Sequence, residues 1–151
     1  MSPGRRAECA AVLESVVRWA VGRDDVRAVG LAGSWARDAA HQGSDVDVVL
    51  LTDTPAHYLR RTDWVVAAVG QAGARLVRTA TWGPLTERRV RLRSGLEVEV
   101  GVARPAWAAV APVDPGTAGV VADGFRALHD PDGLLVALVA AVTAGRAPGG
   151  G

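Results

Sequence analysis

The sequence GSDVDVVLL, at residues 43–51, places two carboxylates inside a short apolar run. A run of this length and composition is typical of a buried β-strand. Side chains alternate between the two faces of a strand, so Asp45 and Asp47 point to one face while Val46 and Val48 point to the other. Two like charges held side by side repel each other, and a divalent cation bound between them offsets the repulsion. Because carboxylates are hard oxygen ligands, the pattern favours Mg²⁺.

A second apolar run, VGLAGS at residues 29–34, ends in a Gly-Ser turn. It predicts a strand over residues 26–32 and a short helix over residues 34–40. Gly33 has no side chain, so the backbone there can approach a ligand closely. Ser34 would begin the helix, and a helix N-terminus attracts anions. Taken alone, the same two residues also fit an ordinary turn with an N-cap serine, and Asp45 and Asp47 also fit a solvated strand face.

The combination of Gly33-Ser34 with Asp45-Val46-Asp47 resembles the signature of the nucleotidyltransferase superfamily, which has the polymerase-beta-like fold. In that superfamily a Gly-Ser turn is followed, about ten residues later, by a strand that carries Asp-x-Asp. The resemblance implies an α+β fold, in which helices pack on one face of a small mixed sheet and the carboxylate site lies on the other. It also implies one nucleotidyltransferase domain over residues 1–144, followed by a flexible Gly-rich tail at residues 145–151.

A third carboxylate is expected from the sequence GLEVEV at residues 95–100. Alternation places Glu97 and Glu99 on the same face of a strand, so their spacing does not separate them. The resemblance implies Glu99, because the third acidic residue of the superfamily usually lies at this position; many members carry Asp there. The alternative is that Glu97 and Glu99 pair across a hairpin with Arg91 and Arg89, each pair contributing ~0.2–1 kcal/mol. For Glu97 this pairing is the favoured interpretation.

The resemblance also assigns roles to residues and ligands. The substrate would be a nucleoside triphosphate, with ATP favoured, and two Mg²⁺ ions would assist the transfer of a nucleoside monophosphate. The implied catalytic and metal-binding residues are Asp45, Asp47 and Glu99, and the implied nucleotide-binding residues are Gly33, Ser34, Arg37 and Ser44. Of these, Arg37 would contact phosphate, and Ser44 would fix the loop before Asp45.

The acceptor is left open by the sequence. The resemblance implies a hydroxyl group of a small, aminoglycoside-like molecule or of a protein. The chain has little beyond the catalytic core, so either a homodimer would complete the acceptor site or the acceptor would be another protein. A small helical protein is the other possible partner. The competing hypothesis is a binding module: an antitoxin-like protein that pairs with a small helical toxin and has weak or no catalytic activity.

The composition excludes several other classes of protein. With 151 residues, 49% of them apolar, the chain is expected to form one folded domain. The net charge of +1 gives no basic field, so a nucleic-acid partner is not expected. All 17 Lys and Arg positions are Arg, which excludes lysine-based chemistry, and the single Cys9 excludes an internal disulfide or a cysteine zinc site. No signal peptide or membrane span is recognisable, so a cytoplasmic protein is expected.

The remaining elements follow from periodicity and from turn residues. We expect a helix over residues 5–22, helical structure in two pieces over 55–70, a strand over 74–81 and a hairpin over 86–102. Pro105, Pro112, Pro115 and Gly116 predict irregular structure over residues 103–119. A short strand over 125–128 and a closing helix over 134–143 complete the chain.

The register of the expected hairpin can be predicted from burial. A three-residue loop at 93–95, with Gly95 in the left-handed conformation, places Val90 opposite Val98 and Arg89 opposite Glu99. Every apolar side chain of the hairpin then lies on one face and every charged side chain on the other. A two-residue loop would mix the faces, so the three-residue loop is predicted.

Overall fold

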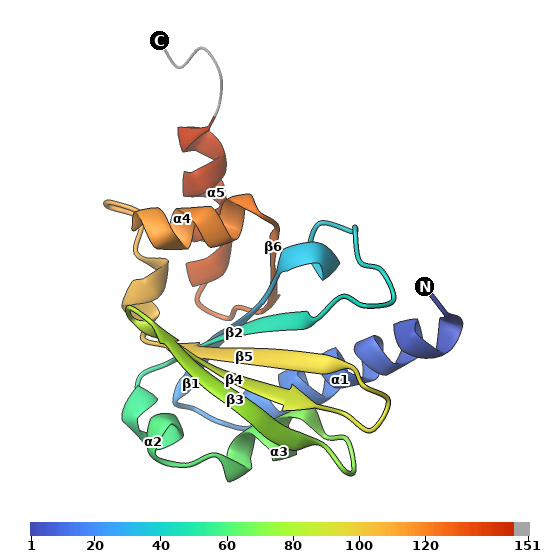
Figure 1. Ribbon diagram of the computed structural model, residues 1–151. Coiled ribbons are helices and arrows are strands. Elements are labelled where there is room, and N and C mark those ends of the chain that lie inside the picture. Colours follow the sequence, from blue (N-terminus) through green and yellow to red (C-terminus); the bar gives the residue numbers. More distant parts are fainter. Residues whose placement is uncertain (147–151) are drawn as a thin grey trace.

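The structure is a computed structural model that describes residues 1–146 (Figure 1). It contains one mixed β-sheet and five α-helices within those residues. The helices are α1 (Pro3–Val21), α2 (Pro55–Arg60), α3 (Asp63–Val69), α4 (Pro115–Ala122) and α5 (Leu134–Gly145). The strands are β1 (Val26–Ala32), β2 (Val46–Thr52), β3 (Arg75–Trp82), β4 (Leu85–Arg91), β5 (Glu97–Ala103) and β6 (Phe125–His129).

The sheet has the strand order β3-β4-β5-β2-β1-β6. The central pair, β2 and β5, is parallel, and the other neighbouring strands are antiparallel. In the parallel pair Val46 lies opposite Val98 and Asp47 lies opposite Glu99. The two strands that were expected to carry the acidic residues are therefore neighbours, although about fifty residues separate them in the sequence.

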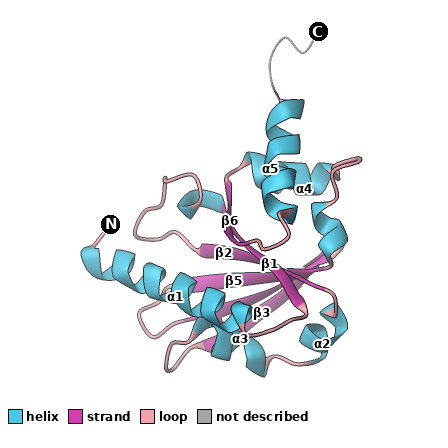
Figure 2. Ribbon diagram, turned by 180° about the vertical axis from the view of Figure 1, so that it is seen from behind, coloured by secondary structure: helices cyan, strands magenta, loops and turns pink. Residues whose placement is uncertain are grey.

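One face of the sheet is covered by α1 and α3, which lie in front of the strands in Figure 2. Val46, Val48, Val98 and Val100 point to this face and are buried. The helices contribute apolar side chains to the same core, among them Val12 and Val16 of α1 and Trp64 and Val65 of α3. This is the helix-covered face that the sequence predicts.

The opposite face is divided along its length. At one end Val49, Leu51 and Ala103 pack against Leu135 and Leu138 of α5. At the other end the same alternation presents charged side chains, including those of Asp47 and Glu99. The carboxylate site therefore lies on the face away from α1, as expected, while α4 and α5 cover the neighbouring part of that face (Figure 1).

The predicted hairpin register is confirmed. Val90 lies opposite Val98 and Arg89 opposite Glu99. The loop is closed by a hydrogen bond from the backbone N–H of Leu92 to the carbonyl oxygen of Leu96 (2.8 Å). Gly95 has φ +93°, the left-handed conformation that the three-residue loop requires. Burial of the apolar side chains thus sets the pairing of β4 with β5.

Two predictions for local structure are wrong. Residues 103–119 are not irregular throughout, because α4 begins at Pro115. Proline is favourable at the first position of a helix, and the Asp114 side chain caps α4 by accepting a hydrogen bond from the N–H of Thr117 (3.1 Å). The helix expected over residues 34–40 is only a 3₁₀ turn at Gly33–Trp35.

The ends of the chain extend the predicted helices by a few residues. Ser2 caps α1 by accepting a hydrogen bond from the N–H of Arg5 (3.1 Å), so the helix begins two residues earlier than expected. Gly145, assigned to the tail from the sequence, is the last residue of α5. The rest of the expected tail, residues 147–151, lies outside the described residues. None of the helices in the described part is long and apolar enough to cross a membrane.

Candidate active site

Asp45, Asp47 and Glu99 come together at one end of the β2–β5 pair. Asp45 immediately precedes β2, Asp47 is its second residue, and Glu99 lies directly opposite Asp47 on β5. One carboxylate oxygen from each of the three residues lies within 4.8 Å of the other two. We call this group the carboxylate cluster. The structure thus brings together the three acidic residues that the sequence analysis assigned to metal binding.

Glu97 is not a member of the carboxylate cluster and instead forms ion pairs with two arginines. Its carboxylate lies 3.4 Å from Nη2 of Arg91 and 3.5 Å from Nη1 of Arg89. This pairing agrees with the favoured interpretation of Glu97 from the sequence. Glu99, two residues further along β5, is the residue that meets Asp45 and Asp47. Strand alternation alone left the two glutamates equivalent, and the parallel pairing with β2 distinguishes them.

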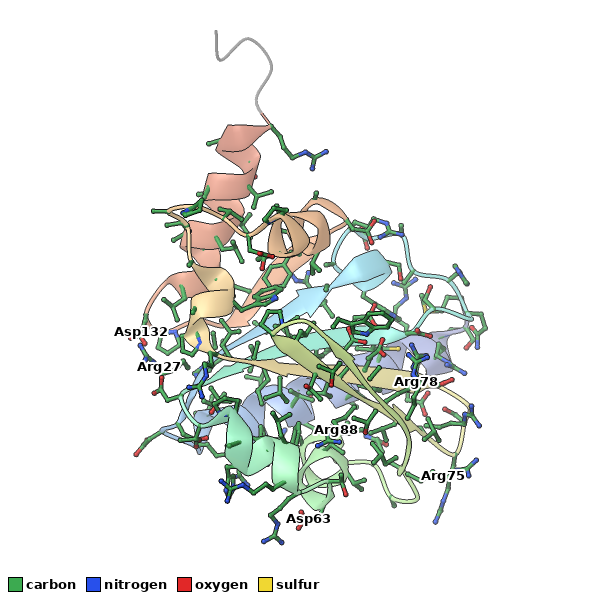
Figure 3. All side chains as sticks on the ribbon, turned by 60° about the vertical axis from the view of Figure 1, so that its left-hand side comes forward. Arg27, Asp63, Arg75, Arg78, Arg88 and Asp132 are labelled. Carbon is green, nitrogen blue, oxygen red and sulfur yellow. The ribbon has the colours of Figure 1, made fainter. Side chains whose placement is uncertain are left out.

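Arg89 of β4 is the cation that contacts the cluster most closely. Its Nη2 lies 3.0 Å from Oδ2 of Asp45 and 3.0 Å from Oε2 of Glu99. Arg78 of β3 contributes a second cation, with its Nη2 3.1 Å from Oε1 of Glu99. Figure 3 shows Arg78 at the opposite end of the sheet from the ion pair between Arg27 and Asp132. The cluster is therefore partly neutralised by side chains from two neighbouring strands.

Asp47 carries the clearest electrostatic perturbation. Burial is the main cause that raises its pKa from 3.8 to about 6, and the charges of Glu99 and Asp45 raise it further. Within the described residues, none of the ion pairs includes Asp47. A half-buried carboxylate beside two others binds a cation favourably, because the cation removes the repulsion that opposes ionisation.

Glu87 is a fourth acidic residue that the sequence analysis missed. It lies on β4 opposite Gly101, and Trp82 Nε1 donates a hydrogen bond to its Oε2 (3.1 Å). Burial and then hydrogen bonding to Glu99 raise the pKa of Glu87 to about 7. The signal was present in the sequence, because Glu87 is two residues from Arg89 and must share its face of the strand.

Gly33 lies against the cluster and has no room for a side chain. Its φ is +75°, and a Cβ atom added there would lie 2.7 Å from Oδ2 of Asp47. Its N–H donates a hydrogen bond to the carbonyl oxygen of Gly124 (3.0 Å), which ties the turn to the start of β6. The Gly-Ser turn and the strand that carries Asp47 are therefore packed directly against each other.

The amino-acid sequence matches a family model over residues 13–100, more than half of the chain, and that family is described as "Nucleotidyltransferase domain". The chain belongs to this family. The matched range contains the Gly33-Ser34 turn and the complete carboxylate cluster. The resemblance inferred from the sequence motifs and the α+β fold expected from it are thus confirmed.

Two solved structures similar to this nucleotidyltransferase domain are both of terminal uridylyl transferase 4 from Trypanosoma brucei. The structure with bound UPU has 18% identity and a TM-score of 0.43, covering 63% of this chain and 35% of the other. The structure with bound UTP and UMP has 18% identity and a TM-score of 0.41, covering 78% of this chain and 38% of the other. The domain thus spans less than two fifths of either structure. A search of curated proteins found no match.

Of the other expected nucleotide-binding residues, Ser34 and Arg37 belong to the segment of the Gly-Ser turn, and Ser44 lies in the loop before β2. Ser34 follows Gly33 and is half-buried, and its carbonyl oxygen accepts a hydrogen bond from the N–H of Ala39 (2.8 Å). Arg37 donates a hydrogen bond to the carbonyl oxygen of Asp123 (2.8 Å), so its guanidinium is held beside the end of α4. Ser44 is buried, and its hydroxyl accepts a hydrogen bond from the N–H of His41 (2.9 Å). Ser44 therefore fixes the loop that leads to Asp45.

A cleft of about 200 Å³ opens beside the carboxylate cluster. Residues of the sheet form part of its lining, and Val120 and Asp123, at the C-terminal end of α4, form another part. It is lined by Gly33, Asp47, Glu87, Glu99 and Gly101, among others. Pockets for drug-sized ligands have volumes of roughly 300–1,000 Å³, so this cleft accommodates a part of a nucleotide rather than all of it.

Proposed function

We propose that this domain transfers a nucleoside monophosphate, with AMP as the first candidate, from a nucleoside triphosphate to a hydroxyl group. The acceptor would be a small, aminoglycoside-like molecule or a protein. The observation that carries the proposal is the convergence of Asp45, Asp47 and Glu99 beside Gly33. Membership of the nucleotidyltransferase domain family supports the general reaction.

The carboxylate cluster suits a divalent cation. Three hard oxygen donors lie within 4.8 Å of one another, and burial, followed by the charges of Glu99 and Asp45, raises the pKa of Asp47. In the proposed reaction Asp45, Asp47 and Glu99 would hold two Mg²⁺ ions. When bound, such ions offset the negative charge on the attacking and leaving oxygens.

The Gly-Ser turn would bind the triphosphate. Gly33 lets the backbone approach the phosphates, and Ser34 would donate from its hydroxyl and N–H groups. Arg37 lies in the same turn and would contribute a positive charge after release from Asp123. Ser44 would act indirectly by fixing the loop that positions Asp45. Because Gly33 contacts Asp47, phosphate groups on the turn would lie next to the cluster.

The proposal is tested by transfer of a label from nucleoside triphosphates. Purified protein is incubated with Mg²⁺, each α-labelled triphosphate in turn, and either a panel of aminoglycosides or a cell lysate. We expect the label to appear on a small molecule or on a protein band, with ATP as the best donor. Label on neither, together with co-purification of a small helical protein, would contradict the proposal and favour the binding module.

Asp47→Ala is the decisive variant for this assay. Loss of a metal ligand removes several kcal/mol of transition-state stabilisation, so transfer should fall by at least about a hundredfold. Asp132→Ala is the matched control, because Asp132 pairs with Arg27 at the opposite end of the sheet from Arg78, the partner of Glu99 (Figure 3). Thermal unfolding of both variants checks that the fold is retained. Transfer by Asp47→Ala at the parental rate would refute the site assignment.

A further inference from the structure

We propose that Arg89 is a resident counter-ion of the carboxylate cluster, which a divalent cation has to displace before it can bind. This inference rests on the proposed role of the cluster as a metal site. It assigns to Arg89 a positioning role: the side chain stabilises the cluster in the nucleotide-free protein and lowers its affinity for metal. The consequence is that the free domain binds divalent cations weakly, although three carboxylates converge there.

The contacts of Arg89 compete directly with a metal. Its Nη2 lies 3.0 Å from an oxygen of Asp45 and 3.0 Å from an oxygen of Glu99. The other oxygen of Glu99 lies 3.1 Å from Nη2 of Arg78. Both oxygens of Glu99 are therefore already in contact with guanidinium groups. A divalent cation at Glu99 would therefore share these oxygens with positively charged guanidinium groups, whose repulsion of the cation favours displacement of one of them.

Burial makes Arg89 the stronger of the competing cations. Its side chain is 19% exposed, whereas the side chains of Arg78 and Arg91 are 53% and 45% exposed. Charge pairs that are shielded from solvent interact more strongly than those on the surface. Arg78 can move into solvent when a cation enters, but Arg89 lies within the cluster between Asp45 and Glu99.

Arg89 is also imperfectly satisfied in this position. Among the described residues, its buried Nε atom has no hydrogen-bond partner. A buried donor without a partner destabilises the arrangement that contains it. The two carboxylates hold the guanidinium in place, but the unpartnered Nε reduces the net stabilisation. A smaller net stabilisation makes Arg89 easier to displace.

The structure also offers a second partner for the displaced side chain. Nη1 of Arg89 already lies 3.5 Å from Oε2 of Glu97, which is outside the cluster. Rotation of the guanidinium toward Glu97 would free the oxygens of Asp45 and Glu99 while keeping one ion pair. Arg89 therefore has two alternative sets of partners, and a bound cation would select the one that includes Glu97.

Binding of Mn²⁺ to the nucleotide-free protein tests the inference without any measurement of activity. Free Mn²⁺ is quantified by electron paramagnetic resonance in titrations of the wild type, Arg89→Met, Arg89→Gln and Arg91→Met. Methionine preserves most of the apolar stem of arginine but removes its charge. Because Arg89→Met removes a charged competitor, we expect it to bind Mn²⁺ at least about tenfold more tightly than the wild type. Arg89→Gln should change affinity in the same direction.

Arg91→Met is the matched control, because Arg91 is on the same strand and face but, within residues 1–146, forms an ion pair with Glu97 and with no member of the cluster. It should bind Mn²⁺ like the wild type.

Thermal unfolding gives a second measurement. Without metal, Arg89→Met should be less stable than the wild type, and Mn²⁺ should raise the Tm of Arg89→Met by more than it raises the Tm of the wild type. Arg89→Lys retains the charge and should keep the weak binding of the wild type.

The possible outcomes separate this inference from the proposed function. Asp47→Asn is titrated in parallel to show whether Mn²⁺ binds at the cluster. If Asp47→Asn does not bind Mn²⁺, but Arg89→Met and Arg89→Gln bind it no more tightly than the wild type does, the role of Arg89 alone is refuted. If Mn²⁺ binding does not depend on Asp47, the cluster is not the metal site and both proposals fail. Tighter binding by the two neutral Arg89 variants, but not by Arg91→Met, supports the inference.

Discussion

The two faces of the β2–β5 pair differ in what their side chains contribute. On the face under α1 and α3, Val46 and Val98 are fully buried in a continuous apolar core. On the opposite face, one residue away along each strand, Asp47 and Glu99 lie in a cluster of like charges. Strand alternation thus places stabilising and destabilising residues side by side. The apolar face holds the backbone in position, which lets the charged face keep an arrangement that is unfavourable in isolation.

The largest effect on stability is expected on the apolar face. Leu50→Ala removes a fully buried side chain from the core and should lower the free energy of unfolding by ~2–5 kcal/mol. Leu59→Ala is the control, because Leu59 is partly exposed on α2 and its loss should cost less than about 1 kcal/mol. Chemical denaturation measures both. Equal losses for the two variants would show that the apolar face does not carry the stability of the sheet.

A smaller effect, on stability and site together, is expected at Gly33. Alanine in the left-handed conformation costs roughly 1–2 kcal/mol, and its Cβ would also press on Asp47. Gly95→Ala is the matched control: Gly95 is also left-handed, but nothing lies within 4 Å of the added Cβ. Both variants should lose stability in denaturation experiments, but only Gly33→Ala should also lose Mn²⁺ affinity. A loss of affinity in Gly95→Ala would contradict this distinction.

The smallest effect concerns pH, because Asp47 is only partly buried and solvent screens its interactions. The pKa of Asp47 is about 6 in the folded protein and near 3.8 when unperturbed, so between these values the folded state binds more protons. The free energy of unfolding of the metal-free protein should therefore fall as pH rises through this window. Glu87, with its pKa raised to about 7, extends the fall toward neutral pH.

Asp47→Asn provides the test of this pH dependence. The variant cannot ionise at this position, so it should be more stable than the wild type at pH 7–8 and lose that advantage near pH 4. Thermal unfolding across this range, with a chelator present, measures the difference. If the wild type instead gains stability relative to Asp47→Asn as pH rises, the pH dependence has the opposite sign. Ionisation of Asp47 would then not be unfavourable in the folded protein.

Local patterns were sufficient to predict much of the sheet. Alternation of apolar and charged residues in β4 and β5 fixed the hairpin register, including the pairing of Arg89 with Glu99. The boundaries of β1 followed from its apolar run between Asp25 and Gly33. In each case the information lies within a few residues, because burial of one strand face determines which side chains must point inward.

The features that the sequence did not reveal depend on distant or competing signals. The parallel pairing of β2 with β5, which separates Glu99 from Glu97, joins segments far apart in the chain. The helix α4 was missed because Pro115 was interpreted as a breaker, although Asp114 before it is a capping residue. The placement of Arg89 between Asp45 and Glu99 requires three strands to be assembled, so no local pattern predicts it.

The most direct test of the central claim compares Glu99→Gln with Glu97→Gln. Both substitutions remove one carboxylate charge from the same strand and face, but only Glu99 belongs to the carboxylate cluster. We predict that Mg²⁺-dependent transfer of nucleoside monophosphate falls at least about a hundredfold in Glu99→Gln. Glu97 is only the more distant, alternative partner of Arg89 (3.5 Å), so in Glu97→Gln transfer should change by less than about fivefold, which corresponds to ~1 kcal/mol. Equal loss in the two variants, or a greater loss in Glu97→Gln, would contradict the account.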